Sequence, residues 1–126
     1  MELQVKSADR NLLLEISGEL DHHGARNALR EVEQAIDAAL PKKLVMDLSG
    51  VTFMDSSGIA LILRTQQKMQ LLDGSMLVCN VPAQARRVLD AAGISRLVTI
   101  RWKRGLHNEN ESIQRGGCGV SQPQQQ

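Results

Sequence analysis

Residues 47–64 read DLSGVTFMDSSGIALILR, and this stretch decides the fold class. An apolar run typical of a β-strand ends in a turn, and after Gly58 the apolar residues recur at helical spacing. Between the two patterns stands Asp-Ser-Ser-Gly, residues 55–58. Aspartate and serine are residue types that cap helices. The stretch therefore predicts a strand, a short polar turn and a helix that begins near Ser57.

Strand-like and helix-like patterns alternate on both sides of that turn. Residues 3–7 and 11–18 flank a short turn and predict a β-hairpin whose second strand ends at Gly18. The loop ELDHHG follows, and from Ala25 the apolar residues keep a helical period up to Pro41. The remaining predicted segments are a strand at 42–48, a strand at 75–80, a third helix after Pro82, and a strand at 96–102.

The strand at 42–48 carries consecutive apolar residues, which predicts burial on both of its faces. Strands that alternate with helices require crossover connections, and these favour parallel neighbours. We therefore predict an α/β fold with a mixed, largely parallel sheet, an N-terminal β-hairpin and the order ββαβαβαβ. The patterned domain spans residues 1–102. Residues 103–126 form a polar tail in which we predict partial disorder and at most a short helix at 107–115.

Composition excludes several classes of function. Lys and Arg number 15 and Asp and Glu number 14, a net charge of +1, whereas nucleic-acid binding needs a concentrated positive excess. Phe53 and Trp102 are the only Phe, Trp or Tyr residues, so bases would have no stacking platform. No apolar run is long enough to cross a bilayer, and the N-terminus lacks the apolar core of a signal peptide. We expect a cytoplasmic protein that binds neither nucleic acid nor membrane.

The Asp-Ser-Ser-Gly turn has two interpretations. It can serve only as a cap, because Asp and Ser side chains accept hydrogen bonds from the unpaired N–H groups of a first helical turn. It can also accept a phosphate. Loops after parallel strands emerge at the carboxyl edge of a sheet, where a serine is exposed, and a helix N-terminus tolerates added negative charge. The residues alone do not choose between Ser56 and Ser57.

The segment GELDHHG, residues 18–24, also follows a strand and precedes a helix. If both helices start at the same edge of the sheet, Asp21 and Asp55 lie on one patch. Asp21 then either caps its helix or belongs to a contact surface. His22 and His23 have no Cys or Glu beside them at ligand spacing, so they do not indicate zinc. We predict no metal and no cofactor.

Two classes of phosphate or acyl chemistry fit the sequence poorly. A serine hydrolase needs the G-x-S-x-G elbow, but here Met54 and Asp55 precede Ser56. A receiver domain phosphorylated on aspartate needs clustered acidic residues after its first strand. Here the first strands form a hairpin that ends in SGELDHH, and Asp47 lies within its predicted strand rather than beyond it. No glycine-rich phosphate loop follows a clear strand either. We predict a protein that is not an enzyme and has no catalytic residues.

Three segments carry a resemblance to a known family: GELDHHGARNALR (18–30), LVMDLSGVTFMDSSGIALILR (44–64) and GSMLVCNVPAQARRVLDAAGI (74–94). Together they resemble the anti-sigma factor antagonists of the sporulation type (stage II sporulation protein AA-like). These are small domains of the STAS class, named for sulfate transporters and anti-sigma antagonists. The likeness runs from about Glu2 to Trp102, and the pairing of ELDHH with FMDSSG is specific.

The resemblance implies a function and a site. In that family the first serine of the DSSG motif, here Ser56, is phosphorylated by a nucleotide-bound serine kinase that doubles as the anti-sigma factor. The unphosphorylated antagonist binds the kinase and frees the sigma factor, the phosphorylated one does not, and a PP2C-type phosphatase resets it. The resemblance implies a partner-binding surface made of Asp21, His22, Asp55, Ser57 and Gly58.

A rival hypothesis keeps the fold and changes the role. The chain would be a STAS docking subunit of a transporter or other regulatory assembly, in which the DSSG turn is only a docking surface without a phosphorylation switch. The family's usual C-terminal helix is poorly matched by the polar tail from Lys103, which leaves the role of that tail open.

Overall fold

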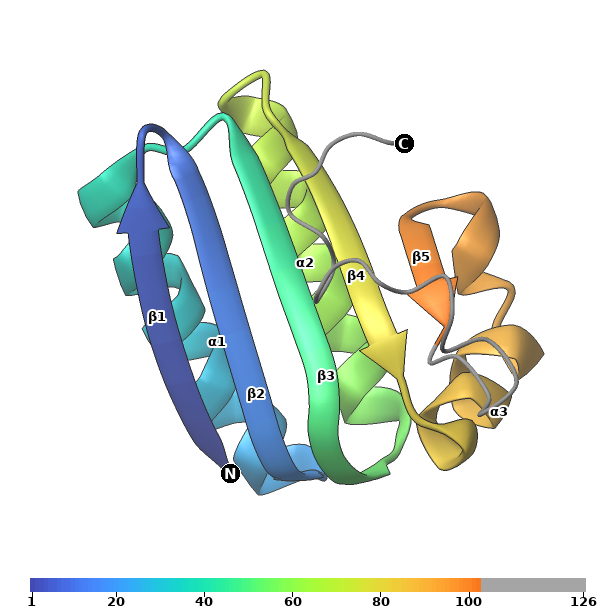
Figure 1. Cartoon of the computed structure of the whole chain (residues 1–126). Coiled ribbons are helices and arrows are strands. Elements are labelled where there is room, and N and C mark those ends of the chain that lie inside the picture. The colour runs from blue at the N-terminus through green and yellow to red at the C-terminus, as the bar shows by residue number, and fades with distance from the viewer. Residues whose placement is uncertain (103–126) are drawn as a thin grey trace, which may run out of the picture.

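Five strands form one sheet in the order β1-β2-β3-β4-β5 in the computed structural model, which describes residues 1–102 (Figure 1). β1 and β2 are antiparallel, and the remaining neighbours are parallel. The predicted fold class is therefore confirmed. The elements are β1 (Glu2–Ala8), β2 (Asn11–Leu20), α1 (His22–Ala39), β3 (Lys43–Met54), α2 (Ser56–Leu71), β4 (Ser75–Val81), α3 (Ala83–Ala91), a 3-10 helix η1 (Ile94–Arg96) and β5 (Thr99–Trp102).

The hairpin between β1 and β2 closes through a two-residue turn. Asp9 and Arg10 both have positive φ, 52° and 68°, and Ala8 pairs with Asn11. Two successive positive φ values are the signature of the tight turn whose twist matches that of the flanking strands. The turn brings the chain back antiparallel, and every later strand is reached through a helical crossover that keeps it parallel.

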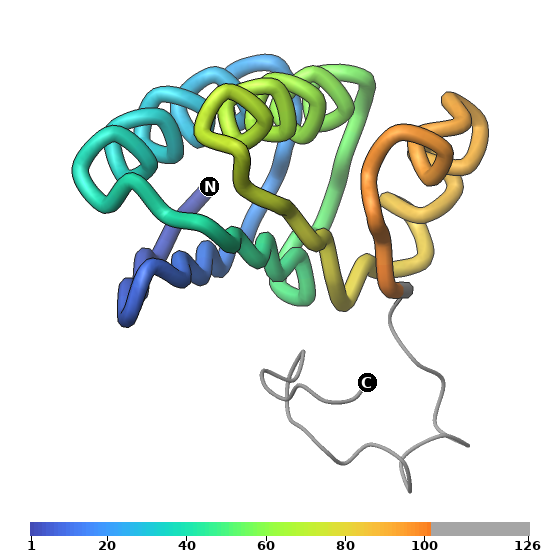
Figure 2. The backbone as a smooth tube through the Cα atoms, turned by 90° about the horizontal axis from the view of Figure 1, so that it is seen from above, coloured from blue at the N-terminus to red at the C-terminus, as the bar shows by residue number. Residues whose placement is uncertain are grey.

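Helices α1 and α2 lie side by side on one face of the sheet, as the view along the layers shows (Figure 2). Side chains from this face and from the two helices make the core. Leu14, Met46, Val78 and Ile62 are all 0% exposed within it. The apolar stripe of each helix thus supplies the burial that stabilises the fold, because buried apolar area is the dominant favourable term.

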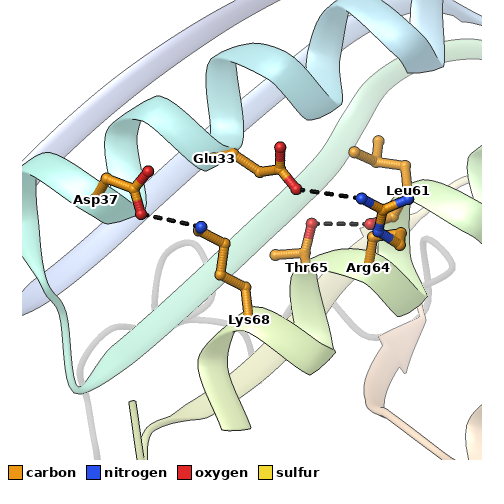
Figure 3. Close-up of polar contacts among 6 residues, drawn as sticks. All are labelled: Glu33, Asp37, Leu61, Arg64, Thr65 and Lys68. Carbon is orange, nitrogen blue, oxygen red and sulfur yellow. Dashed lines mark hydrogen bonds and ion pairs between the residues drawn. The ribbon is translucent and has the colours of Figure 1, made fainter. Parts of the chain in front are cut away.

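Two ion pairs connect the outer surfaces of α1 and α2 (Figure 3). Lys68 Nζ lies 2.9 Å from an Asp37 carboxylate oxygen, and an Arg64 guanidinium nitrogen lies 3.7 Å from Glu33. The Asp37 side chain is 68% exposed, so water screens the attraction and each pair contributes little free energy. Their geometry still agrees with two helices that run in the same direction from the same edge of the sheet.

The structure corrects several predicted boundaries. β2 does not end at Gly18 but runs to Leu20, so the predicted loop ELDHHG is reduced to a single residue before α1. Gly18 has φ of 93° and sits where the pairing of β2 with β3 shifts register. Its backbone freedom serves a bulge inside the strand instead of a turn after it. α1 accordingly begins at His22 rather than Ala25.

The prediction that the third strand is buried on both faces is wrong. β3 extends from Lys43 to Met54, and within it Leu44, Met46 and Leu48 are buried while Val45 and Asp47 are partly exposed. Both helices that cover the sheet centre lie on one side, so only alternate residues of the strand meet them (Figure 2).

Smaller differences concern the first residues of α2 and of the last strand. α2 begins at Ser56, one residue earlier than predicted, and the last strand is only Thr99–Trp102 because residues 94–96 form the 3-10 helix. The predictions about the tail at 103–126, its disorder and its short helix, lie outside the described residues.

Candidate functional site

The carboxyl ends of β2 and β3 lie at one edge of the sheet (Figure 1). These strands are parallel, and their last paired residues are Leu20 and Met54. One residue beyond this pair, the backbone N–H of Asp55 donates a 3.4 Å hydrogen bond to the carbonyl oxygen of Leu20. Asp21 and Asp55 are therefore the first residues past two neighbouring strands, and α1 and α2 begin beside each other.

Asp21 is the N-cap of α1. Its backbone is extended, and its carboxylate oxygen accepts a 2.8 Å hydrogen bond from the N–H of Gly24. This bond satisfies one of the donors that a first helical turn leaves unpaired, which is why the helix can begin at His22. The expected capping role of Asp21 is confirmed. His22 and His23 are exposed, and they lie in the first turn of the helix rather than in a loop.

Asp55 repeats the same arrangement for α2. Its carboxylate accepts a 2.8 Å hydrogen bond from the N–H of Ser57, and its carbonyl oxygen accepts a 3.0 Å hydrogen bond from the N–H of Gly58. The aspartate of the DSSG motif is thus the cap, and neither serine is. Since one residue suffices for capping, both hydroxyl groups are left for another role or for solvent.

The two serines differ in accessibility. Ser56 is exposed at the first position of α2, whereas Ser57 is half-buried in the same turn. Ser56 forms no side-chain hydrogen bond or ion pair within residues 1–102. Its hydroxyl group is therefore available to a second macromolecule, and it stands at the positive end of a helix of 16 residues.

Two glycines let the chain pass closely at this edge. A Cβ atom on Gly24 would lie 2.2 Å from the backbone oxygen of Glu19, so no side chain fits there without moving the backbone. A Cβ atom on Gly58 would lie 2.5 Å from Cγ of Met54, a flexible side chain. Gly58 itself is buried. It shapes the turn from beneath and does not belong to the outer surface.

The site is acidic, because the carboxylates of Asp21 and Asp55 cap the two neighbouring helices. Among the ion pairs formed within the part of the chain that the structure describes, none involves Asp21 or Asp55. In the same part of the chain, no group of three or more His, Cys, Asp or Glu side chains is placed to hold a metal ion. No helix in residues 1–102 combines the length and the apolar character that crossing a membrane requires.

Two features of the site were missed by reasoning from the sequence. The side-chain amide of Gln84 binds the backbone of Met54, and Phe53 is 41% exposed although it is one of the few aromatic residues. Gln84 lies in α3, 30 positions after Met54, so no local sequence pattern indicates this contact. The exposure of Phe53 follows from strand alternation: it points away from the face on which Met54 is buried.

The family model of the STAS domain matches residues 2–106, and the chain therefore belongs to the STAS domain family. A curated relative, the anti-sigma F factor antagonist of Paenibacillus polymyxa, is 32% identical over 102 residues, which make up 79% of this chain and 87% of the relative. The anti-sigma F factor antagonist of Lysinibacillus sphaericus is 27% identical over 95 residues, or 75% of this chain and 81% of the relative.

A solved structure of the anti-sigma factor antagonist SpoIIAA in its unphosphorylated form has the same fold. Its TM-score is 0.68 at 21% identity, with 86% of this chain and 93% of that chain covered. The phosphorylated form of the Bacillus cell fate determinant SpoIIAA gives a TM-score of 0.62 at 21% identity, with 86% and 96% covered. The family resemblance read from the sequence is confirmed. Both curated relatives are named as anti-sigma F factor antagonists, in agreement with the prediction that the chain is not an enzyme.

Proposed function

We propose that this chain is an anti-sigma factor antagonist whose partner binding is switched by phosphorylation of Ser56. In its unphosphorylated state it binds a nucleotide-bound serine kinase that also serves as the anti-sigma factor, and the sigma factor is released. Phosphorylation ends that binding, and a PP2C-type phosphatase restores it. The cycle would run in the cytoplasm.

The observation that carries the proposal is the position of Ser56. Its hydroxyl group is exposed at the start of α2, and the neighbouring cap residues Asp21 and Asp55 lie on the same edge. A kinase can reach such a group without unfolding the domain. The half-buried Ser57 is less accessible, which supports Ser56 as the phosphoacceptor. The names of the two curated relatives, both anti-sigma F factor antagonists, support the partner class.

Charge accounts for the switch. A phosphoryl group carries about −1.5 to −2 charges and would be added beside the carboxylates of the cap residues Asp21 and Asp55. Against a carboxylate of a docked partner about 6 Å away, each unit-charge pair repels by roughly 0.7 to 3 kcal/mol, depending on effective dielectric. Doubled for a dianion, this is on the order of 1 to 6 kcal/mol, or about one to four decades of affinity. Such a change requires no refolding.

The proposed contact surface divides into outer and inner residues. Asp21, His22 and Asp55 offer polar groups at the edge, with His22 exposed and the two aspartates partly so. Ser57 lies at the base of the turn. The buried Gly58 contributes by letting α2 start close to Met54, so its role in binding is to set the shape of the surface.

Phosphorylation by a cognate kinase tests the proposal. The kinase would be recognised by its capture of a sigma factor, and the products of incubation with ATP would be mapped by mass spectrometry. We expect full phosphorylation of the wild type and of Ser57→Ala, and none of Ser56→Ala. A Ser56→Ala protein that is phosphorylated as fully as the wild type would refute the assignment.

A further inference from the structure

The carboxyl-terminal half of β3 extends past its neighbour β4. The two strands pair from Lys43 to Asp47 only, while β3 continues to Met54. On its other side this extension keeps β2 as a partner, with Leu20 opposite Met54. β4 ends at Val81 and leads into α3, which packs against β3 near the end of the strand (Figure 1). The end of the strand that leads into Asp55 thus faces a helix instead of a strand.

The side chain of Gln84, on the first turn of α3, takes the place of the missing strand. Its amide oxygen accepts a 2.8 Å hydrogen bond from the N–H of Met54, and its amide nitrogen donates a 2.9 Å hydrogen bond to the Met54 carbonyl oxygen. A planar amide that makes both bonds to one residue fixes the direction of that residue's N–H and C=O together. The pairing imitates what a neighbouring strand would provide.

The peptide unit between Met54 and Asp55 is consequently held from both sides. Its carbonyl oxygen accepts the hydrogen bond from Gln84, and its N–H donates to the carbonyl oxygen of Leu20. This is the last peptide unit before the cap residue. Asp55 in turn holds the N–H of Ser57 with its carboxylate, so the chain on both sides of Ser56 is fixed.

We propose that Gln84 is a positioning residue for phosphorylation: it fixes the Met54–Asp55 peptide so that the Ser56 hydroxyl is presented to the kinase in a preformed geometry. This inference rests on the proposed function, and Gln84 itself need not touch the kinase. The helix that carries Gln84 is packed into the core, because Ala85 and Leu89 of α3 are only 1% and 0% exposed. Phosphoryl transfer depends on holding the attacking oxygen in line, so a loosened turn lowers the rate.

A matched pair of substitutions tests the role. Gln84→Met keeps the length of the side chain and removes both hydrogen bonds. Gln66→Met is the control, because Gln66 of α2 also donates its amide to a backbone carbonyl, that of Leu97, at 2.9 Å. Gln84→Glu is the second variant: as a carboxylate it still accepts from the Met54 N–H, but its other oxygen would face the Met54 carbonyl oxygen and repel it. It also serves if Gln84→Met fails to fold.

Two measurements are made on all variants: hydrogen exchange of the Met54 amide by NMR, and the kcat and KM of Ser56 phosphorylation. For Gln84→Met we expect Met54 exchange to be faster by about tenfold or more, and kcat/KM to fall by about tenfold, chiefly through kcat. In Gln84→Glu the Met54 exchange should also be faster and kcat lower than in the wild type, and Gln66→Met should match the wild type in both measurements. Phosphorylation of Gln84→Met at the wild-type kcat/KM would overturn the inference.

Failure of the proposed function is distinguishable from failure of this inference. If the wild type is not phosphorylated by the kinase, the proposed function is wrong, and hydrogen exchange alone then judges Gln84. Faster Met54 exchange in Gln84→Met, with the Gln66→Met control unchanged, supports the positioning of the turn. Met54 exchange at the wild-type rate contradicts it.

Discussion

The backbone N–H of Asp55 donates a 3.4 Å hydrogen bond to the carbonyl oxygen of Leu20, although 34 residues lie between them in the sequence. Asp21 follows Leu20 directly, and neighbouring strands are about 5 Å apart. This one bond therefore brings the cap of α1 beside the cap of α2. The proposed switch depends on that closeness, because an added anion on Ser56 then changes the charge of the whole edge.

We expect Ser56→Asp to weaken binding to the anti-sigma kinase, the proposed partner of the unphosphorylated protein. One added charge about 6 Å from a partner carboxylate costs roughly 0.7 to 3 kcal/mol, which corresponds to about a 3- to 150-fold rise in Kd. Calorimetric titration at two salt concentrations measures the Kd. The difference in Kd between Ser56→Asp and the wild type should shrink at high salt, because exposed charges are screened.

The controls for that experiment are Ser56→Asn and circular dichroism. Ser56→Asn has a side chain of similar size without charge, so it should bind more tightly than Ser56→Asp. The far-ultraviolet circular dichroism spectrum should be the same for the wild type, Ser56→Asp and Ser56→Asn. Equal affinities of the Asn and Asp variants would show that charge is not the mechanism.

Asp21 has a structural and a proposed binding role, and two substitutions separate them. Asp21→Ala removes the 2.8 Å cap bond to the Gly24 N–H and should lower the free energy of unfolding by about 1 kcal/mol. Asp21→Ser retains a capping oxygen and should lower the free energy of unfolding by only about 0.3 kcal/mol. Urea unfolding gives both values.

Both Asp21 variants lose the carboxylate, so both should bind the kinase at least about fivefold more weakly, the scale of a significant interface residue. If Asp21→Ser binds as tightly as the wild type while Asp21→Ala does not, the residue acts through the cap and not through contact with the partner.

Gly24→Ala should be markedly destabilising. The new Cβ would lie 2.2 Å from the backbone oxygen of Glu19, and neither backbone can move without disturbing the end of β2. We expect a loss of about 2 to 3 kcal/mol in the free energy of unfolding, the upper range for overpacking. The higher helix propensity of alanine offsets at most about 1 kcal/mol.

Gly58→Ala is the comparison for Gly24→Ala. Its Cβ would lie 2.5 Å from Cγ of Met54, and this side chain, which is 1% exposed, would have to shift within the core. The loss should be about 1 to 2 kcal/mol, smaller than for Gly24→Ala because a side chain, and not a backbone oxygen, has to move. The opposite order of the two urea midpoints would contradict the described packing.

The open face of the sheet predicts different costs for the same substitution on two central strands. Val78 in β4 is 0% exposed, so Val78→Thr buries a hydroxyl group and should cost about 1 to 3 kcal/mol. Val45 in β3 is partly exposed on the opposite face, and Val45→Thr should cost less than about 0.5 kcal/mol. Equal losses in urea unfolding would show that the face carrying Val45 is buried as well.

Local sequence patterns were reliable wherever a local cause was at work. Apolar periodicity identified the three α-helices and the five strands of residues 1–102, and Asp21 was identified as a possible cap because Asp side chains accept hydrogen bonds from free N–H groups near in sequence. The errors arose where distant residues decide. Gly18 is typical of a strand end but serves a bulge against β3, and Val45 continues an apolar run although only one face of its strand meets helices.

The amino-acid sequence by itself determined the α/β class, the order of the elements and the presence of a polar turn with two serines at a helix start. These features depend on side-chain periodicity and on capping, which act within a few residues. Only the tertiary structure decided that Asp55 lies beside Asp21, that Ser56 is the exposed serine and that Gln84 holds Met54. Strand pairing and helix packing join residues far apart in the chain, and no local pattern specifies those contacts.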